Sequence, residues 1–308
     1  MTTFVLHRTL RAALTLLVVL TGVFFATRLT GDPTLFLLPD DASPAMRSEL
    51  RATLGLDGPP LLQYGAYLAA VARFDFGVSY YERRPVSTML RERIGPTFTL
   101  ATASLLLALA IGLPAGIVAA LRRDTLLDRA VMALSFSAYA IPNFVLGIGL
   151  IFLLSLTLRW LPSSGSGGWE HLVMPVITLG ASSAALLARL TRGSVLDTLH
   201  HDYVRTAHAK GLAARGVVLK HVMRNAFTPI LTVLGLQIGT IVAGSVVVET
   251  VFAWPGIGRM IVRAVQQRDF PVLQFAVVVV ATSVVLANLI VDLAYAVVDP
   301  RVRHGGAA

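Results

Sequence analysis

The sequence has 308 residues, of which 55% are hydrophobic and only 14% are charged, and this composition excludes an ordinary soluble globular domain. The formal charge of +9 could indicate a nucleic-acid partner, but the basic residues lie between apolar blocks and form no stripe with interleaved aromatics, so no nucleic acid is expected. The chain has no cysteine, which excludes disulfides, thiolate metal sites and cysteine nucleophiles.

Long apolar blocks recur along the chain, and a helix needs roughly 20 mostly apolar residues to cross a bilayer. The first block follows Arg8 and Arg11, and no A-x-A-like cleavage site follows it. It therefore predicts a retained first span, with a removed signal peptide as the alternative. The sequence predicts an all-α polytopic membrane protein with about six transmembrane helices, at about Ala12–Ala26, Thr97–Leu121, Ala130–Leu158, Leu172–Leu190, Ala226–Val248 and Leu273–Val298.

The distribution of Lys and Arg predicts that both termini lie in the cytoplasm. If the amino terminus is inside, the inner segments hold 14 basic residues and the two short outer loops hold 4. Cytoplasmic loops carry an excess of Lys and Arg, and long translocated loops are excluded from this count. The sequence thus favours an N-in, C-in topology.

Three segments are expected: a first transmembrane helix at 1–28, an external helical cap at 29–95, and a five-helix transmembrane core at 96–308 with a cytoplasmic loop at 191–225. Within the cap, Ser43 is a plausible N-cap for a helix that starts at Pro44 and ends near Gly55. A second, amphipathic helix is expected over 61–73.

Glycines and prolines inside the spans predict close packing and kinks. Helices in lipid associate through close packing, for which Gly112-x3-Gly116 and Gly235-x3-Gly239 are suitable faces. Pro142 and Pro175 are expected to kink or start helices.

The cytoplasmic loop at 191–225 predicts a short helix. Asp202 can cap a helix that begins at Tyr203, with Lys210 in the last turn and Gly211 just beyond the end. Isolated helices shorter than about 12 residues are marginal in water, so this one must pack against something. Two interpretations stay open: a docking surface for a cytoplasmic partner, or a basic loop that binds only lipid head groups.

A series of motifs carries a family resemblance over nearly the whole chain. The loop contains Asp-Tyr-Val-Arg-Thr-Ala-His-Ala-Lys-Gly-Leu at 202–212 and His-Val-Met-Arg-Asn-Ala at 221–226. Gly-Asp-Pro stands at 31–33, Ile-Pro-Asn-Phe at 141–144, and Trp-Pro-Gly at 254–256. With these motifs the chain resembles the inner-membrane permeases of ATP-binding cassette importers, in the dipeptide, oligopeptide and nickel branch. It departs from the broader permease pattern at Arg205-Thr206, where Glu-Ala is usual, and at Arg224, where Pro is usual.

The resemblance implies a type I importer permease in a prokaryotic cytoplasmic (inner) membrane, and it implies partners. These are a homologous second permease, two cytoplasmic ATPase subunits that bind ATP and Mg, and an extracytoplasmic substrate-binding protein, with membrane lipid around them. The resemblance leaves four kinds of cargo open: a dipeptide, a longer peptide, a nickel complex or a glutathione-like molecule. The residues that the resemblance assigns to ATPase coupling are Tyr203, Arg205, Thr206, Ala207, Lys210, Gly211 and Leu212.

The chain itself is not expected to be an enzyme or to hold a cofactor. A phosphate-binding loop needs Gly-Lys-Ser/Thr, but Lys210 follows alanine and Lys220 follows leucine. The loop histidines His200, His201 and His208 match no zinc pattern, so solvated side chains are preferred to a metal site.

Polar residues within the last two spans have two interpretations. Gln237, Asn288 and Asp292 could line or gate a translocation path, or they could form interhelical hydrogen bonds. A stand-alone secondary transporter is the alternative function, although such carriers commonly keep several ionisable residues at the midplane and Asp292 is nearly the only candidate here. An intramembrane hydrolase lacks an obvious base, because the histidines fall outside the apolar blocks or at their edges.

Overall fold

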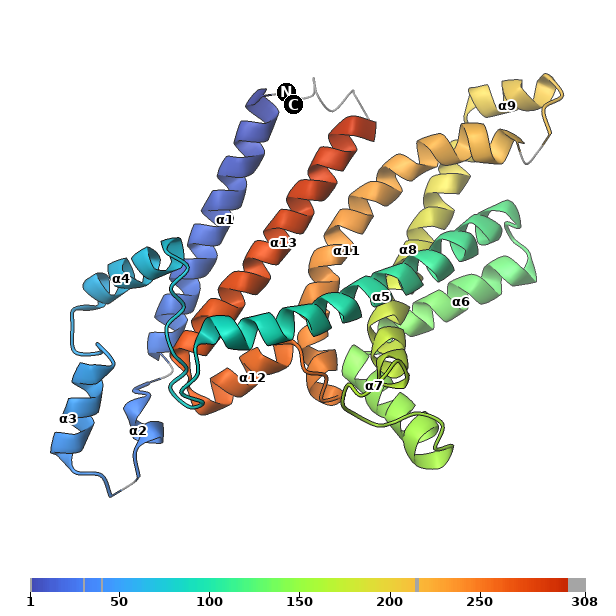
Figure 1. The fold of residues 1–308 in the computed structure, drawn as a ribbon. Coiled ribbons are helices and arrows are strands. Elements are labelled where there is room, and N and C mark those ends of the chain that lie inside the picture. Colours follow the sequence, from blue (N-terminus) through green and yellow to red (C-terminus); the bar gives the residue numbers. More distant parts are fainter. Residues whose placement is uncertain (1, 30, 40, 214–215, 299–308) are drawn as a thin grey trace. The chain divides into compact units, whose positions relative to one another are not determined.

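The computed structural model of the chain describes residues 2–29, 31–39, 41–213 and 216–298 (Figure 1). These residues form helices and no β-strand, with one isolated bridge between Val78 and Pro85. The all-α prediction is therefore confirmed. Contacts divide the chain into two compact units: unit 1 comprises Met1–Phe4, Phe98–Trp254 and Leu286–Ala308, and unit 2 comprises Val5–Thr97 and Pro255–Val285.

Five helices among the described residues are each long and apolar enough to cross a membrane. They are α1 (Thr2–Leu29), α5 (Val86–Leu121), α8 (Glu170–Leu199), α11 (Met223–Val251) and α13 (Phe270–Val298). Helix α5 begins at Val86, well before the predicted start at Thr97. Its 36 residues extend about 54 Å, which exceeds the roughly 30 Å of a hydrocarbon core.

The third predicted span, 130–158, is broken in the structure. It consists of α6 (Leu126–Ala140), α7 (Asn143–Leu150) and the π-helical segment η1 (Ile151–Thr157), and the chain bends by 99° between α6 and α7. Pro142 explains the break, because it has no N–H to donate and forces Ile141 into an extended conformation (φ −78°, ψ 121°). The prediction that Pro142 kinks or starts a helix is confirmed, whereas the single continuous helix is not.

Helix α8 is the centre of unit 1, where it packs against α11, α6 and α7. Glycines let α5 approach it closely: a Cβ on Gly112 would lie 2.7 Å from the Ala184 carbonyl oxygen, and one on Gly116 would lie 2.5 Å from that of Ala188. The predicted Gly112-x3-Gly116 packing face is therefore confirmed. A Cβ on Gly235 of α11 would similarly lie 2.7 Å from Val291 Cγ1 of α13.

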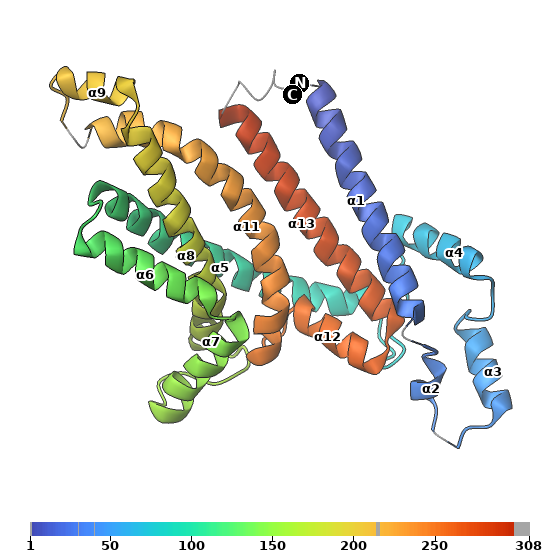
Figure 2. The same ribbon diagram turned by 180° about the vertical axis from the view of Figure 1, so that it is seen from behind.

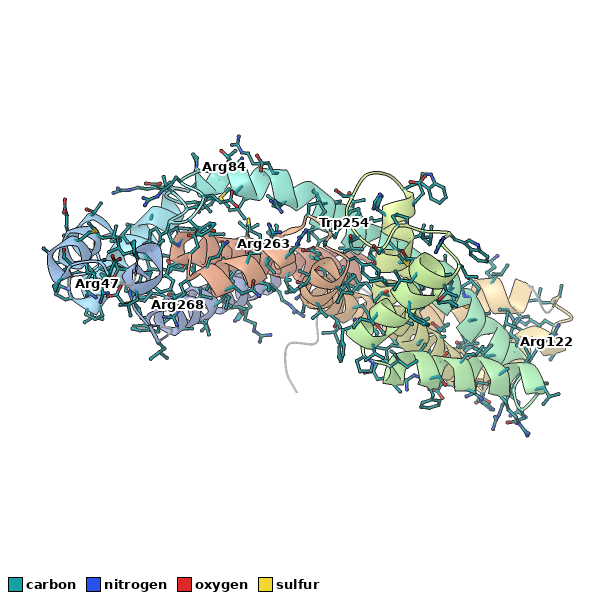
Figure 3. All side chains as sticks on the ribbon, turned by 90° about the horizontal axis from the view of Figure 1, so that it is seen from below. Arg47, Arg84, Arg122, Trp254, Arg263 and Arg268 are labelled. Carbon is teal, nitrogen blue, oxygen red and sulfur yellow. The ribbon has the colours of Figure 1, made fainter. Side chains whose placement is uncertain are left out.

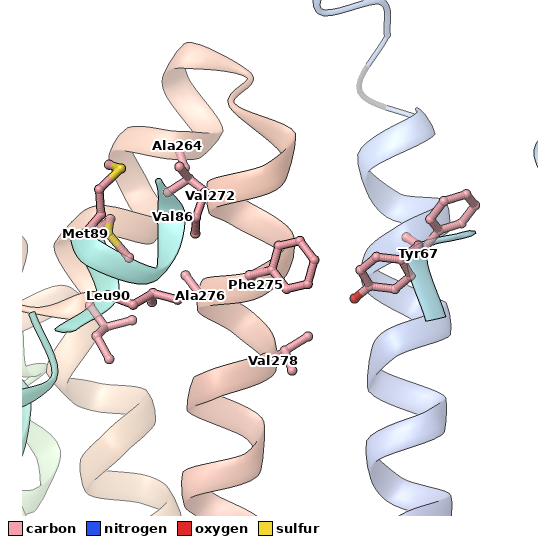
Figure 4. Packing of buried hydrophobic residues seen from close by; sticks show 12 residues of the cluster. Tyr67, Val86, Met89, Leu90, Ala264, Val272, Phe275, Ala276 and Val278 are labelled. Atoms are coloured by element: carbon pink, nitrogen blue, oxygen red, sulfur yellow. The ribbon is translucent and has the colours of Figure 1, made fainter. Parts of the chain in front are cut away.

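The core of unit 2 joins α5 to the two last helices of the chain (Figure 4). Side chains of the first turns of α5 pack against α12 (Ile257–Gln267) and the first half of α13. Tyr67 of α4 (Pro60–Ala72) faces Phe275 with 5.8 Å between ring centroids and stacks on Phe24 of α1 at 5.6 Å. Aromatic contacts thus connect α4, α1 and α13.

The segment between α1 and α5 is folded. It contains α2 (Thr34–Leu37), α3 (Pro44–Thr53) and α4. The Met46 N–H donates to Ser43 Oγ at 3.2 Å, which confirms the predicted N-cap. Gly55 follows α3 with φ +66°, in the left-handed region that glycine favours.

Buried Asp269 fixes the start of α5 in unit 2. Its carboxylate accepts hydrogen bonds from Ser79 Oγ at 2.5 Å and from the Tyr80 N–H at 3.1 Å. Because Asp269 lies between α12 and α13, these bonds hold the loop before α5 against the α12–α13 turn.

Candidate coupling site

The predicted loop helix is present as α9 (Asp202–Ala209), beyond the end of α8 (Figure 2). It buries Val204 and Ala207, which are one turn apart and are 2% and 5% exposed. They belong to an apolar cluster, hereafter the α9 cluster, with residues from α5, α8, the π-helical segment η2 (Val217–Val222) and α11: Ala120, Val195, Val217, Val222 and Ala226. Packing within the chain thus supports a helix that is too short to be stable alone.

The amino-terminal end of α9 differs from the prediction. Asp202 is the first residue of the helix rather than its cap, and its side chain is almost fully exposed. The His201 carbonyl accepts from the N–H groups of Val204 (3.0 Å) and Arg205 (3.4 Å) instead. The Asp202 charge still lies in the first turn, where the helix dipole favours it.

The carboxyl-terminal end agrees with the prediction. Gly211 has φ +74°, and the Leu212 N–H donates to the Ala207 carbonyl at 3.4 Å. This six-to-one hydrogen bond across a left-handed residue is the Schellman arrangement. Gly211 therefore ends α9.

Most of the residues that the sequence assigned to coupling share one property, which is that they are exposed on α9 or its following turn. They are Tyr203, Arg205, Thr206, Lys210, Gly211 and Leu212. Ala207 is different, because it lies in the α9 cluster and cannot touch a partner directly. The side chain of His208 lies outside the described part of the chain.

Tyr203 anchors α9 to the start of α11. Asn225 Nδ2 donates to the Tyr203 hydroxyl at 2.8 Å, and the Tyr203 ring lies 5.6 Å from that of His201. A cavity of about 880 Å³ opens beside this contact. Its lining is polar and rich in basic groups: Ser194, Asp197, Thr198, His201, Tyr203, Lys220, His221, Arg224, Asn225 and Pro229.

An ion pair that sequence reasoning missed connects α8 to α6. Arg192 Nε and Nη2 donate to the two carboxylate oxygens of Asp128 at 2.6 and 2.7 Å, and Asp128 is buried. The two residues are 64 positions apart, so no local pattern in the sequence indicates their contact.

The loop histidines do not gather into a metal site within the described residues, which contain no group of three or more His, Cys, Asp or Glu suited to a metal ion. The Nδ1 atoms of His200 and His201 lie 2.7 and 3.0 Å from the carbonyl oxygens of Leu196 and Asp197, one turn back in α8.

The predicted path residues lie in different surroundings. Gln237 is buried, and its Nε2 donates to the Ser183 carbonyl of α8 at 3.4 Å, which is the contact that interhelical hydrogen bonding predicts. Asn288 is exposed on α13. The side chain of Asp292 lies outside the described part of the chain.

Comparison with known proteins finds similarity along the whole sequence. Residues 112–304 match the family described as "Binding-protein-dependent transport system inner membrane component". The glutathione transport system permease protein GsiC of Escherichia coli (strain K12) is 41% identical over 305 residues, which cover 99% of this chain and 100% of that protein. The protein of the same name from Salmonella choleraesuis (strain SC-B67) is 42% identical over the same length.

Similarity in structure points the same way for the fold. Two crystal forms of the inward-facing MetNI methionine ABC transporter match with TM-scores of 0.59 and 0.60 at 19% sequence identity. Each match covers 70% of this chain and 98% of the other chain. At this identity the similarity concerns the fold alone.

Proposed function

Because the chain belongs to the family of binding-protein-dependent transport system inner membrane components and is a permease subunit of an ATP-binding cassette importer, we propose that α9 is its contact with a cytoplasmic ATPase. The observation that carries the proposal is the division of α9 into two sides. Val204 and Ala207 bind it to its own chain, while Arg205 and Thr206 remain exposed. Packing on one side holds the other side as a fixed, exposed surface that a protein partner can bind.

The mechanism follows from this division. When two ATPase subunits close on ATP and Mg, they pull on the exposed side of α9, and the α9 cluster passes that displacement to the ends of α5, α8 and α11. Arg205 and Lys210 supply the charge for an acidic or polar groove on the ATPase. Gly211 fixes where the helix stops and so where Leu212 is presented.

The proposed assembly has a second, homologous permease, two ATPases and an extracytoplasmic binding protein. Both termini and α9 lie in the cytoplasm, and the helices α2 to α4 lie outside. The family consists of translocation subunits, so the secondary transporter that the sequence left open is set aside. ATP hydrolysis belongs to the partner subunits.

The proposed cargo is a peptide or a related small solute. Relatives that are 41% and 42% identical over nearly the full length are named for glutathione transport, which makes glutathione the first cargo to test. Gln237, Asn288 and Asp292 are proposed to lie along the path.

The absence of cysteine from the natural chain makes a direct test of the α9 contact possible. A single cysteine at Arg205 (Arg205→Cys) is expected to crosslink to an ATPase subunit when the assembled importer is treated with a short bifunctional thiol-to-amine reagent. Arg122→Cys is the matched control, because Arg122 is an exposed cation in the other cytoplasmic turn, between α5 and α6 (Figure 3).

ATP with vanadate, which traps closed ATPases, should change the crosslinking yield at Arg205→Cys but not at Arg122→Cys. Equal yields from the two positions in correctly inserted protein would contradict the proposal. The same cysteines test the topology: both should react with a membrane-impermeant maleimide only from the cytoplasmic side.

A further inference from the structure

Arg189 lies inside the apolar part of α8 and is held by aromatic rings of α6. Its guanidinium carbon is 5.0 Å from the Phe136 ring centroid and 4.6 Å from that of Tyr139. Its Nε is buried and has no hydrogen-bond partner among the described residues. Among those residues, no carboxylate pairs with it either, in contrast to Arg192 one turn away.

The side chain of Arg189 extends away from the ion-paired end of α8. Asp128 marks that end on α6, and Phe136 and Tyr139 follow it by about 12 and 16 Å along the helix axis. Side chains of an α-helix tilt toward its amino terminus, which for α8 is the direction of these rings. Arginines near a membrane surface usually extend toward water instead, so this orientation places the charge deeper in the apolar layer.

The bend between α6 and α7 lies next to the rings of Phe136 and Tyr139. Tyr139 is in the last turn of α6, two residues before Ile141, and the chain bends by 99° between α6 and α7. Irregular backbone at membrane depth occurs where it is buried in protein or lines a water-filled cavity. Phe136 and Tyr139 are 60% and 52% exposed and Arg189 is half-buried, so these three residues lie at the surface of unit 1 rather than in a sealed core.

We propose that Arg189 is an anion-binding residue of the translocation path and that it receives a carboxylate of the cargo as the cargo passes the α6–α7 break. The proposal rests on the proposed function and names a substrate class for it, peptide-like anions. A guanidinium offers two parallel N–H donors that match a carboxylate. Phe136 and Tyr139 stabilise the cation through their ring faces while the path is empty.

The first experiment needs no knowledge of the cargo. Ala140→Cys, studied in the assembled importer, places the only thiol of this chain at the bend, one residue beyond Tyr139. An anionic sulfonate methanethiosulfonate reagent should modify it at least fivefold faster than the cationic trimethylammonium analogue. Adding Arg189→Gln should remove this preference. Adding Arg129→Gln, which removes an exposed cation from the same helix, should leave the preference intact.

Two results would overturn the proposal: a thiol unreactive toward both reagents, which would mean that no aqueous path reaches the break, or a preference that Arg189→Gln does not change. Because this readout involves neither transport nor ATP hydrolysis, it is independent of the α9 contact.

The second experiment addresses the cargo class in proteoliposomes that contain the complete importer and its binding protein. Arg189→Gln is expected to lower uptake of glutathione about tenfold or more, because a charge-assisted hydrogen bond is lost. Uptake of glutathione diamide, compared at equal amounts of loaded binding protein, should change less than about twofold. Equal losses for the two probes would instead indicate that Arg189 pairs with a carboxylate of the second permease, and would overturn the assignment to cargo.

Discussion

Arg192 holds Asp128 at two points, and this pair fixes the beginning of α6 to the last third of α8. The Asp124 N–H also donates to Asp128 Oδ2 at 3.0 Å, and Thr125 Oγ1 accepts from the Asp128 N–H at 3.4 Å. The carboxylate therefore joins the α5–α6 turn to the helix that leads into α9. Movement of that end of α8 must move the start of α6 with it.

Asp128→Asn should lower the stability of the protein markedly, because it leaves Arg192 largely buried without its counter-charge. Removing one member of a buried pair costs on the order of 3 kcal/mol. A fall in melting temperature in detergent, measured by tryptophan fluorescence, would report it. Asp124→Asn is the control, since that exposed side chain forms a surface pair with Arg123 at 3.2 Å and acts on Arg192 more weakly than Asp128 does. A double-mutant cycle with Arg192→Gln should yield a coupling energy well above zero, and additivity would contradict the assignment.

Gly116→Ala should weaken the packing of α5 on α8. The new Cβ would lie 2.5 Å from the Ala188 carbonyl oxygen and 2.6 Å from Thr191 Cβ, so the helices must separate. We expect a loss of about 1–3 kcal/mol, seen as lower yield of folded protein and a lower melting temperature. Gly149→Ala in α7 is the matched control, because nothing lies within 4 Å of its Cβ position. Similar melting temperatures for the two variants would count against a close α5–α8 contact.

Gly211→Ala should impair coupling without preventing insertion. A left-handed conformation costs alanine about 1 kcal/mol, which favours unwinding of the last turn of α9. We expect correctly inserted importer that hydrolyses more ATP per cargo molecule imported. Gly216→Ala, in the same loop but at a glycine without positive φ and with open space around it, should couple like the wild type. Unchanged coupling in Gly211→Ala would show that the Schellman end of α9 does not matter for transport.

Asp32 makes the segment between α1 and α5 sensitive to acid. Burial alone would raise the pKa of Asp32, but hydrogen bonds from Thr34 and the ion pair with Arg51 outweigh it and lower the pKa below its ordinary value. The ionised form therefore stabilises the fold above about pH 4, and this contribution is lost as the pH falls further. Asp32→Asn should lower the melting temperature at pH 7, by the equivalent of about 1 kcal/mol, and less so below pH 4. Glu49→Gln, at an exposed position of α3, is the control: its melting temperature should differ from that of the wild type by the same amount at pH 7 and below pH 4.

Gln237→Leu distinguishes the two interpretations of that residue. If its amide only bridges α11 and α8 through the Ser183 carbonyl, the variant should lose about 0.6 kcal/mol of stability and keep its transport rate per folded importer. If Gln237 lines the path, transport should fall while the melting temperature barely changes. Thermal melting and uptake measured on the same preparation separate the two outcomes.

The sequence allowed the local features of the fold to be predicted, because their causes are local. Ser43 caps α3, Gly211 ends α9, and Gly112 and Gly116 mark a close approach, each for a reason contained in a few neighbouring residues. Pro142 was expected to disturb its helix, but the size of the bend depends on what α6 and α7 pack against. Composition could not supply that information.

The least predictable features were contacts between distant residues. Asp128 and Arg192 are far apart in the chain, and Arg189 read as one more basic residue at the inner end of a span. Only the length of α8, which continues to Leu199, places both arginines against α6. The buried position of Ala207 likewise follows from η2 and α11, which the pattern of residues 202–211 does not describe.

Under the proposed function, the packing of the α9 cluster determines how a displacement of the ATPase reaches the membrane helices. A helix connected only by its loops would move independently, and a displacement imposed by the ATPase would bend the loops without moving the membrane helices. Here Val204 and Ala207 pack against side chains at the ends of three spans. Because packed interiors deform little, α9 and these ends are expected to move together. In the proposed mechanism, force on the exposed side of α9 therefore displaces whole membrane helices, and a cavity introduced into the α9 cluster should weaken coupling before it lowers stability.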